Sequence, residues 1–389
     1  MILKIFIGLL LLFAGHLSVS AVKIPEIVDV GILYQQHITG FSFSPENGSY
    51  SICDEQHRKI AEVQPHSELY LEITPEGFTI TKNDTIIATE KRITVQGASF
   101  SNTFFISRSP APFKGNAYSG DLTVFNKNGS FQFINHVPFE SYVAGTVETE
   151  SGLHRHPEFY KVQAVVIRTY ALKNFHRHKK EGFDLCDKVH CQAYHGRSSC
   201  ADIANAVYDT KGEVLVDTTG RVLNTVYHAN CGGETTRSQD LWVEEKPYLQ
   251  SQTDHFCKGM PGSEWKITIP QKTFRNFVEQ NLGKKLSDSL WHEMVDFQQP
   301  YRKIFLDPEH KINLRMVREY FGLRSTFFSL EKINDQIHFS GKGYGHGVGL
   351  CQEGAMNRAK NGHSKEEILM FYYKNSLLMT MEPEEAVFN

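Results

Sequence analysis

The middle of the chain combines an acidic segment with a cationic helix, a pairing that could carry acid–base chemistry. Glu150 closes the acidic segment, and the helix predicted over residues 158–175 carries Lys161 and Arg168 seven positions apart. Seven positions are two helical turns, so both cations fall on one face. A carboxyl beside such a face could exchange a proton with a bound substrate. A solvated helix face next to an ordinary acidic turn is the simpler explanation of the spacing alone.

A glycine-rich segment near the C-terminus could present polar side chains to a ligand. Residues 341–354 contain six glycines together with His346 and Gln352. Glycine permits backbone conformations that other residues avoid and lets a ligand approach the main chain. The spacing fits neither of the common phosphate-binding glycine patterns. A purely structural glycine turn is the alternative.

A third motif, CGGET over residues 231–235, is followed by the aromatic residues Trp242 and Tyr248. Consecutive glycines at a strand end with nearby aromatics suit a platform for a sugar ring. They suit a tight turn beside a core patch equally well.

Two of the seven cysteines lie in a short loop that could hold a metal. Cys186 and Cys191 enclose His190, and His176 and His178 precede them. Two thiolates and two imidazoles would complete a tetrahedral, structural zinc site, for which His178 is favoured over His176. A disulfide between the two cysteines, which an oxidising compartment would favour, and free thiols are the alternatives.

Two further cysteines, Cys231 and Cys351, belong to the glycine motifs. They could pair with each other if these motifs meet, or could be small buried thiols. A nucleophilic cysteine paired with His346 would need a third group to orient the base, and the sequence offers none.

The chain has an α+β pattern and is long enough for two domains. It has 389 residues, 40% of them hydrophobic, which suffices for a sizeable core. Alternating apolar residues between turn signals predict strands at residues 70–74, 78–81 and 92–95 and a hairpin at residues 122–134. We expect, in chain order, a signal peptide (1–20), a β-rich N-terminal module (22–114), a first part of the catalytic domain (115–257), a helical insertion or subdomain (258–330), and a C-terminal part of the catalytic domain with the glycine-rich loop (331–375).

The N-terminus has the features of a secretory signal. Lys4 precedes an apolar run over residues 5–14, and small residues follow at Ser18, Ser20 and Ala21. The run is shorter than the roughly 20 residues that span a bilayer, so we expect cleavage and export to the periplasm or the cell-wall side of the cytoplasmic membrane. Retention as an uncleaved anchor is the alternative. The net charge of −3 gives no basic excess, so nucleic acid is not an expected partner.

The motifs occur together in an order that resembles the stage II sporulation protein D family, also called the amidase-enhancer family. The resemblance rests on the sequences VPFESYVAG at 137–145 with Glu150, KVQAV at 161–165 with RTY at 168–170, CGGET at 231–235, and GYGHGVG at 343–349 with QEGA at 352–355. It covers roughly residues 115–375.

The resemblance implies a lytic transglycosylase that cleaves between N-acetylmuramic acid and N-acetylglucosamine in denuded peptidoglycan glycan strands and leaves anhydro-muramic acid ends. Glu150 matches the catalytic glutamate of the family, although Ser151 and Gly152 replace a usual Met-Pro pair and Glu148 replaces a small residue. No cofactor is needed for catalysis, and some members carry zinc in the loop at 186–191. The substrate-binding residues that we expect are Lys161, Gln163, Arg168, Tyr170, Tyr227, His346 and Gln352.

One carboxyl suffices for such a reaction, whereas a hydrolysing glycosidase normally needs two. The primary hydroxyl of the substrate attacks in place of water, so one group can protonate the leaving oxygen and then accept the proton of that hydroxyl. This requires a Glu150 pKa well above the ordinary value, and hence a poorly solvated pocket. The alternative is a non-catalytic wall-binding module that stimulates a partner amidase, as the second family name suggests.

Overall fold

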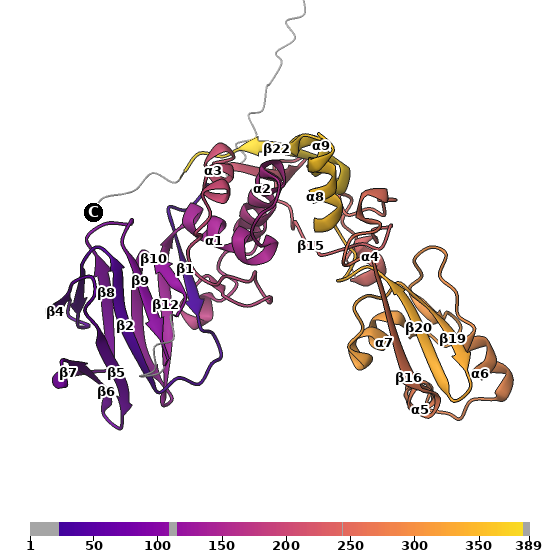
Figure 1. Cartoon of the computed structure of the whole chain (residues 1–389), viewed down its shortest axis with the longest axis horizontal. Coiled ribbons are helices and arrows are strands. Elements are labelled where there is room, and N and C mark those ends of the chain that lie inside the picture. Colours follow the sequence, from indigo (N-terminus) through magenta and orange to yellow (C-terminus); the bar gives the residue numbers. More distant parts are fainter. Residues whose placement is uncertain (1–22, 109–114, 243, 384–389) are drawn as a thin grey trace, which may run out of the picture.

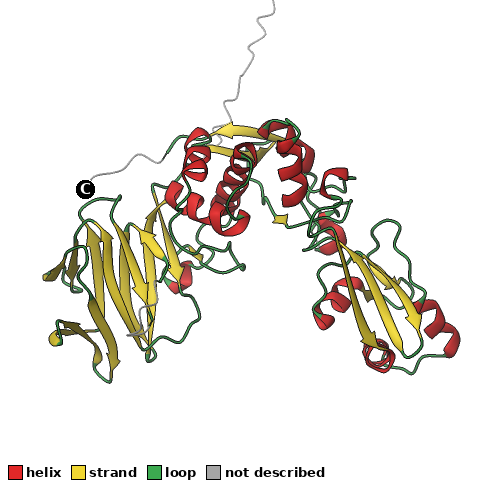
Figure 2. Cartoon of the chain, viewed as in Figure 1, coloured by secondary structure: helices red, strands yellow, loops and turns green. Residues whose placement is uncertain are grey.

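The computed structural model describes residues 23–108, 115–242 and 244–383. The expected signal peptide lies outside the described residues. The described chain forms an arch of three parts: a β-sheet part at one end, a helical part in the middle, and a smaller lobe at the other end (Figure 1). Strands dominate the first part and helices the second, as the colouring by secondary structure shows (Figure 2). The α+β class is confirmed.

The N-terminal part consists of two mainly antiparallel sheets. The first contains, in spatial order, β13 (Leu185–Cys186), β1 (Ile27–Ile32), β12 (Ser130–Pro138), β11 (Asp121–Lys127), β8 (Arg92–Gly97), β3 (Tyr50–Cys53) and β4 (Lys59–Val63). The second contains β10 (Ala117–Ser119), β9 (Thr103–Ser107), β2 (Gly40–Asn47), β5 (Leu69–Thr74), β6 (Gly77–Lys82) and β7 (Thr85–Glu90). The strands predicted at residues 70–74, 78–81 and 92–95 are confirmed.

Aromatic side chains join the two sheets. The ring of Phe41 on β2 lies 4.8 Å from that of Phe131 on β12, and Phe43 lies 5.5 Å from Tyr50 on β3. Edge-to-face contacts at such distances are favourable beyond the area that they bury. The hairpin predicted at 122–134 is β11–β12, and it pairs with β1 and β8. These sheets therefore extend to Pro138, past residue 114 where the module was expected to end.

The middle part packs helices around α2 (Pro157–Lys173), most of which is buried. Proline at the first helical position is compatible with the helix because that N–H has no partner within the helix. Helices α1, α3 and α9 and strand β14 pack against α2. The remaining elements are α1 (Phe139–Ser151), η1 (Lys179–Glu181), α3 (Ala201–Asp209), β14 (Glu213–Asp217), β15 (Tyr227–His228), α4 (Ser238–Leu241), η2 (His255–Cys257), β21 (Leu350–Cys351), α8 (Gln352–Lys360), α9 (Lys365–Tyr372) and β22 (Ser376–Thr380).

The lobe has its own hydrophobic core, centred on Phe274, Phe328 and Phe339. It contains β16 (Glu264–Pro270), α5 (Gln271–Leu282), α6 (Asp288–Val295), β17 (Phe305–Asp307), β18 (Ile312–Asn313), α7 (Leu314–Phe321), β19 (Phe328–Ile333) and β20 (Gln336–Lys342). The expectation of a helical insertion was incomplete, because a three-stranded antiparallel sheet, β16–β20–β19, supports the three helices.

The chain passes into the lobe after Ser263 and returns at Gly343, whose N–H donates to the Ser263 carbonyl at 2.9 Å. The Gly345 N–H also donates to the Arg324 carbonyl of the lobe at 2.9 Å. The chain thus leaves for the lobe and returns from it at one point. Among the described residues, no helix is both long and apolar enough to cross a membrane.

Candidate active site

Glu150 lies in the last turn of α1, beside a pocket. The helix ends at Ser151 because Gly152 adopts a positive φ of 70°, which turns the chain away. The pocket has a volume of about 380 Å³. It is lined by Glu150, Ser151, Arg155, Phe159, Ala229, Met260, Pro261, Gln352, Glu353, Met356 and Lys360. The side chains therefore come from α1, α2, α8 and the chain segments after β15 and η2.

The Glu150 carboxyl is partly buried and accepts hydrogen bonds from uncharged donors. The Ala193 N–H donates to Oε1 at 2.7 Å, and the Tyr227 hydroxyl is also hydrogen bonded to this carboxyl. Burial raises the pKa of Glu150, and these two hydrogen bonds offset part of the rise. The negative end of the α1 dipole also disfavours the carboxylate. The carboxyl therefore keeps its proton to a higher pH than an exposed glutamate does.

Gln352 and His346, both expected to bind substrate, contact protein atoms, and of the two only Gln352 lines the pocket. The Gln352 Nε2 donates to the Glu150 carbonyl at 3.2 Å, which fixes the start of α8 to the end of α1. His346 donates through Nε2 to the Tyr227 carbonyl at 2.9 Å and accepts through Nδ1 from the Val348 N–H at 3.0 Å. Both ring nitrogens are thus occupied, and burial lowers the pKa of His346 to about 4. A neutral His346 holds Tyr227 in place.

The glycines of this loop are needed for its close approach to β15. At Gly345, where φ is +113°, a Cβ would lie 2.7 Å from the Cβ of His228. At Gly343, where φ is +80°, it would lie 2.7 Å from the Asn230 carbonyl oxygen. Only glycine satisfies both the backbone angle and the spacing. The loop is therefore a close-packed support for Tyr227.

Arg168 and Lys161 lie away from the pocket and pair with acids of the protein. The Arg168 side chain has no exposed surface. Its Nε and Nη2 donate to Glu140 at 2.9 and 2.6 Å, and its Nη1 donates to the Glu213 carbonyl. Lys161 pairs with Asp209 at 3.0 Å. The expectation that both cations bind substrate needs correction, because a buried guanidinium with its donors engaged has none to offer a sugar.

Gln163 and Tyr170 lie on α2, respectively four and eleven residues after Phe159, the pocket residue of that helix. Gln163 is fully buried, and both its side-chain oxygen and its nitrogen lack a hydrogen-bond partner. The Tyr170 hydroxyl accepts from Arg177 at 3.2 Å. Neither residue lines the pocket.

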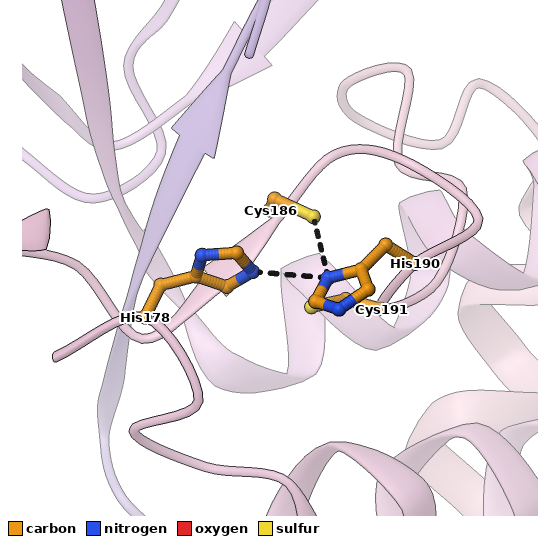
Figure 3. Close-up of side chains that lie close together, drawn as sticks. All are labelled: His178, Cys186, His190 and Cys191. Carbon is orange, nitrogen blue, oxygen red and sulfur yellow. Dashed lines mark hydrogen bonds between the residues drawn. The ribbon is translucent and has the colours of Figure 1, made fainter. Parts of the chain in front are cut away.

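The loop after α2 brings His178, Cys186, His190 and Cys191 together, with their ligand atoms all within 4.8 Å of one another (Figure 3). His190 Nδ1 lies 3.3 Å from His178 Nε2 and 3.8 Å from each sulfur. A tetrahedral zinc ion with bonds of about 2.0 Å to nitrogen and about 2.3 Å to sulfur requires ligand separations of roughly 3.3 to 3.8 Å. The donor set thus fits zinc, and neither sulfur is bonded to another cysteine.

The surroundings of this cluster also suit a metal. His178 Nδ1 pairs with Glu181 Oε1 at 2.6 Å, which directs Nε2 to the cluster centre. A carboxylate on the second ring nitrogen is usual for a zinc-bound histidine. His176 lies apart and pairs with Asp184. Because Cys191 is two residues before Ala193, the cluster fixes the loop that donates to Glu150.

Several residues of the site were not predicted from the sequence. The Ala193 N–H is a backbone group, so no pattern of side-chain types in the sequence predicts its contact with Glu150. Arg155 and Lys360 add positive charge to the pocket wall, but isolated basic residues are too common to single out in a sequence.

Comparison with known proteins agrees with this arrangement. Residues 127–216, which include Glu150 and the His178 cluster, match the SpoIID family, described as stage II sporulation protein. This part of the chain is therefore similar to the SpoIID family. The resemblance predicted from the motifs is confirmed, and the match covers the end of the β11–β12 hairpin and the helices that hold Glu150.

Individual relatives are similar to this chain over more residues than the family match covers. An uncharacterised protein of Brachyspira hyodysenteriae is 26% identical over 79% of this chain and 86% of its own length. Stage II sporulation protein D of Bacillus subtilis is 28% identical over 63% of this chain and 75% of its own length. The amidase enhancer of Bacillus subtilis is 26% identical over 57% of this chain but only 38% of its own length.

Proposed function

We propose that this protein is a lytic transglycosylase of peptidoglycan glycan strands, with Glu150 as its general acid and base. The observation that carries the proposal is a partly buried glutamate with a raised pKa, at the wall of a pocket, hydrogen bonded by uncharged donors. An acid used near neutral pH must retain its proton there, and burial is the usual means. The relationship to stage II sporulation protein D and to an amidase enhancer supports a role in the cell wall.

The reaction needs one group that gives a proton and takes one back. The protonated Glu150 donates to the oxygen of the bond between N-acetylmuramic acid and N-acetylglucosamine, which leaves as an alcohol. The primary hydroxyl of the muramic acid attacks the anomeric carbon and closes the anhydro ring. Its proton goes to the Glu150 carboxylate, so the acid is regenerated and no water is consumed.

Supporting groups position this acid. The Ala193 N–H and the Tyr227 hydroxyl fix the carboxyl, and His346 fixes Tyr227 in turn. Arg155 and Lys360 are the pocket cations suited to acidic or polar groups of the glycan. Zinc bound by His178, Cys186, His190 and Cys191 would act structurally, because four protein ligands leave no open position. Catalysis itself needs no cofactor, and we expect the protein to act outside the cytoplasmic membrane.

The decisive experiment replaces the acid with its amide. Purified protein is incubated with denuded glycan, and anhydro-muramic ends are measured by mass spectrometry. Glu150→Gln should lower the rate about 10²- to 10⁴-fold, the usual contribution of a general acid–base group. Glu148→Gln is the matched control on the same helix. Glu148 accepts from Ser198 and Ser199 at 2.7 and 2.8 Å, a task that an amide oxygen also performs, so its rate should stay within a few-fold.

The second candidate is a non-catalytic module that stimulates a partner amidase, and the similarity to an amidase enhancer favours it. Glycan binding by wild type and Glu150→Gln alike, with no anhydro ends from either, together with stimulation of an added amidase, would establish this candidate. It would also refute the transglycosylase.

A further inference from the structure

A second cluster of cysteines lies outside the site described above. Cys231 follows β15, Cys257 ends η2, and Cys351 ends β21, so three separate segments each contribute a sulfur. Asp254 completes the set, and the four ligand atoms all lie within 4.8 Å of one another. All four side chains are buried, with no exposed surface. Their number and compactness are those of the ligands around a single ion.

Backbone N–H groups point at the sulfurs. The Cys231 and Gly354 N–H groups lie 3.2 and 3.4 Å from Cys351 Sγ, and the Gly233 N–H lies 3.1 Å from Cys257 Sγ. Such donors favour a thiolate over a neutral thiol. The two glycines of the CGGET and QEGA motifs thus supply N–H groups to the cluster.

The carboxylate is held as metal-bound carboxylates usually are. Asp254 Oδ2 accepts from the Tyr372 hydroxyl at 2.6 Å, and Oδ1 accepts from Arg358 at 3.2 Å. Partners of this kind orient a ligand toward an ion. A side chain at Gly354 would lie 2.2 Å from Asp254 Oδ2, so glycine there leaves room for the pair.

Two cations balance the charge of the cluster. Three thiolates and one carboxylate around a divalent ion carry a net charge of −2. The Arg358 guanidinium contacts the carboxylate, and the Arg302 guanidinium, from the lobe, donates to the Cys231 carbonyl at 2.6 Å. The Arg302 guanidinium also donates to the Glu234 carbonyl and to Thr326 Oγ1, and the Arg302 backbone N–H donates to the Glu234 carboxylate at 3.1 Å. An anionic cluster would place further negative charge beside this guanidinium.

We propose that Cys231, Asp254, Cys257 and Cys351 form a second metal site that binds a structural zinc ion. Three sulfur ligands select a soft divalent cation over magnesium or calcium. The Sγ atoms of Cys231 and Cys257 lie 3.2 Å apart, between the separation of about 2.0 Å in a disulfide and of about 3.8 Å across a tetrahedral zinc site. A disulfide between Cys231 and Cys257 would leave Cys351 as a buried thiol and would not involve Asp254. Binding displaces the thiol protons to solvent.

The position of this ion gives it a task. Cys231 belongs to the CGGET motif, Cys351 precedes α8, and Arg302 belongs to the lobe. The ion would therefore tie the start of α8, which carries Gln352, to the root of the lobe. It is distinct from the cluster of His178, Cys186, His190 and Cys191, which lies beside β1.

The test measures the zinc content of protein that lacks only the expected signal peptide (residues 1–20) and is purified under reducing conditions. The double variant Cys231→Ser/Cys351→Ser should lose one equivalent of zinc relative to wild type, by elemental mass spectrometry. Cys186→Ser/Cys191→Ser reports separately on the first cluster, and Cys200→Ser, outside both, should match wild type. A folded Cys231→Ser/Cys351→Ser protein with wild-type zinc content would overturn the proposal.

Wild-type crystals provide a test that does not depend on the folding of any variant. Anomalous diffraction on either side of the zinc edge should give a peak about 2.3 Å from the three sulfurs. The absence of a peak there in crystals grown with added Zn²⁺ would refute the site. A disulfide-linked peptide containing Cys231 and Cys257, found by peptide mapping of the protein without reduction, would also refute it. Neither measurement depends on glycan cleavage, so the proposal of a metal site is tested independently of the proposed function.

Discussion

Two glutamates near opposite ends of α1, Glu140 and Glu150, lie in opposite electrostatic settings. Glu140 lies in the first turn and pairs with the buried Arg168 at 2.6 Å. Glu150 lies in the last turn, and no ion pair between described residues involves it; its identified partners are the Ala193 N–H and the Tyr227 hydroxyl. The helix dipole favours a carboxylate at the first turn and disfavours it at the last. An ion pair thus neutralises the charge at one end, while the carboxyl at the other end keeps its proton to higher pH.

The first prediction concerns the ion pair between Glu140, in the first turn of α1, and Arg168. Arg168→Met leaves the Glu140 carboxylate partly buried without a cation, which should lower the free energy of unfolding by about 3 kcal/mol. Lys161→Met is the matched control on the same helix. Its partner Asp209 is half exposed, so the loss should stay below about 1 kcal/mol. Urea unfolding measures both, and equal losses would show that burial of Arg168 does not make its ion pair important.

The second prediction concerns the loop whose Ala193 N–H donates to Glu150. Cys191→Ser removes a predicted zinc ligand two residues before Ala193, so its N–H should lose its fixed position opposite Glu150. The rate of anhydro-end formation should fall about 10- to 100-fold, as is usual when the support of a site is loosened. Cys200→Ser should keep the wild-type rate. An unchanged rate in a zinc-free Cys191→Ser protein would separate the metal loop from catalysis.

The third prediction tests the hydrogen bond from Tyr227. Tyr227→Phe removes a donor that lowers the pKa of Glu150, so this pKa should rise. Because the acid must be protonated to act, the alkaline limb of the pH profile of kcat/KM should move to higher pH. The maximal rate should fall about fivefold, the effect of one hydrogen bond of about 1 kcal/mol. A limb that moves to lower pH would contradict the assignment of this donor.

The fourth and smallest effect is on stability. Burial raises the pKa of Glu150 above its unfolded value, so between the two pKa values the folded chain binds more protons than the unfolded chain. Stability therefore falls as pH rises through this window, and above it the ionised carboxylate destabilises the fold. Glu150→Gln should be more stable than wild type at neutral pH, and this advantage should vanish below the unfolded pKa. Thermal unfolding at several pH values measures this difference.

The sequence predicted local structure well where the pattern was strong. The hairpin over β11 and β12, the helix α2 and the helical content of the lobe follow from period and turn signals. The lobe sheet was missed because β16 pairs with β20, from Pro270 opposite Gln336 to Glu264 opposite Lys342, which are far apart in the sequence. Strand pairing at that separation leaves no local signal.

The site was only partly predictable, again because its contacts join residues that are far apart in the sequence. Of the expected site residues, Tyr227 and Gln352 contact Glu150, and His346 contacts Tyr227. The motifs gave no way to distinguish a buried structural cation from one that faces a substrate, so Arg168 was misassigned. Its environment is set by Glu140 and by the Glu213 carbonyl, 28 and 45 residues away in the sequence. The contribution of Asp254 and Cys257 to the second cluster was also invisible, because no regular spacing relates them to Cys231 and Cys351.

The chain enters and leaves the lobe at neighbouring points, Ser263 and Gly343, which has a consequence for how such chains diversify. Lobe residues other than Arg302 and Arg324, which bond to the middle part, can be gained, lost or rewritten while the spacing of Glu150, Tyr227 and Gln352 is preserved. Length differences among relatives should therefore concentrate between residues 263 and 343. Specificity for wall components at a distance from the cut bond could evolve there without disturbing the acid.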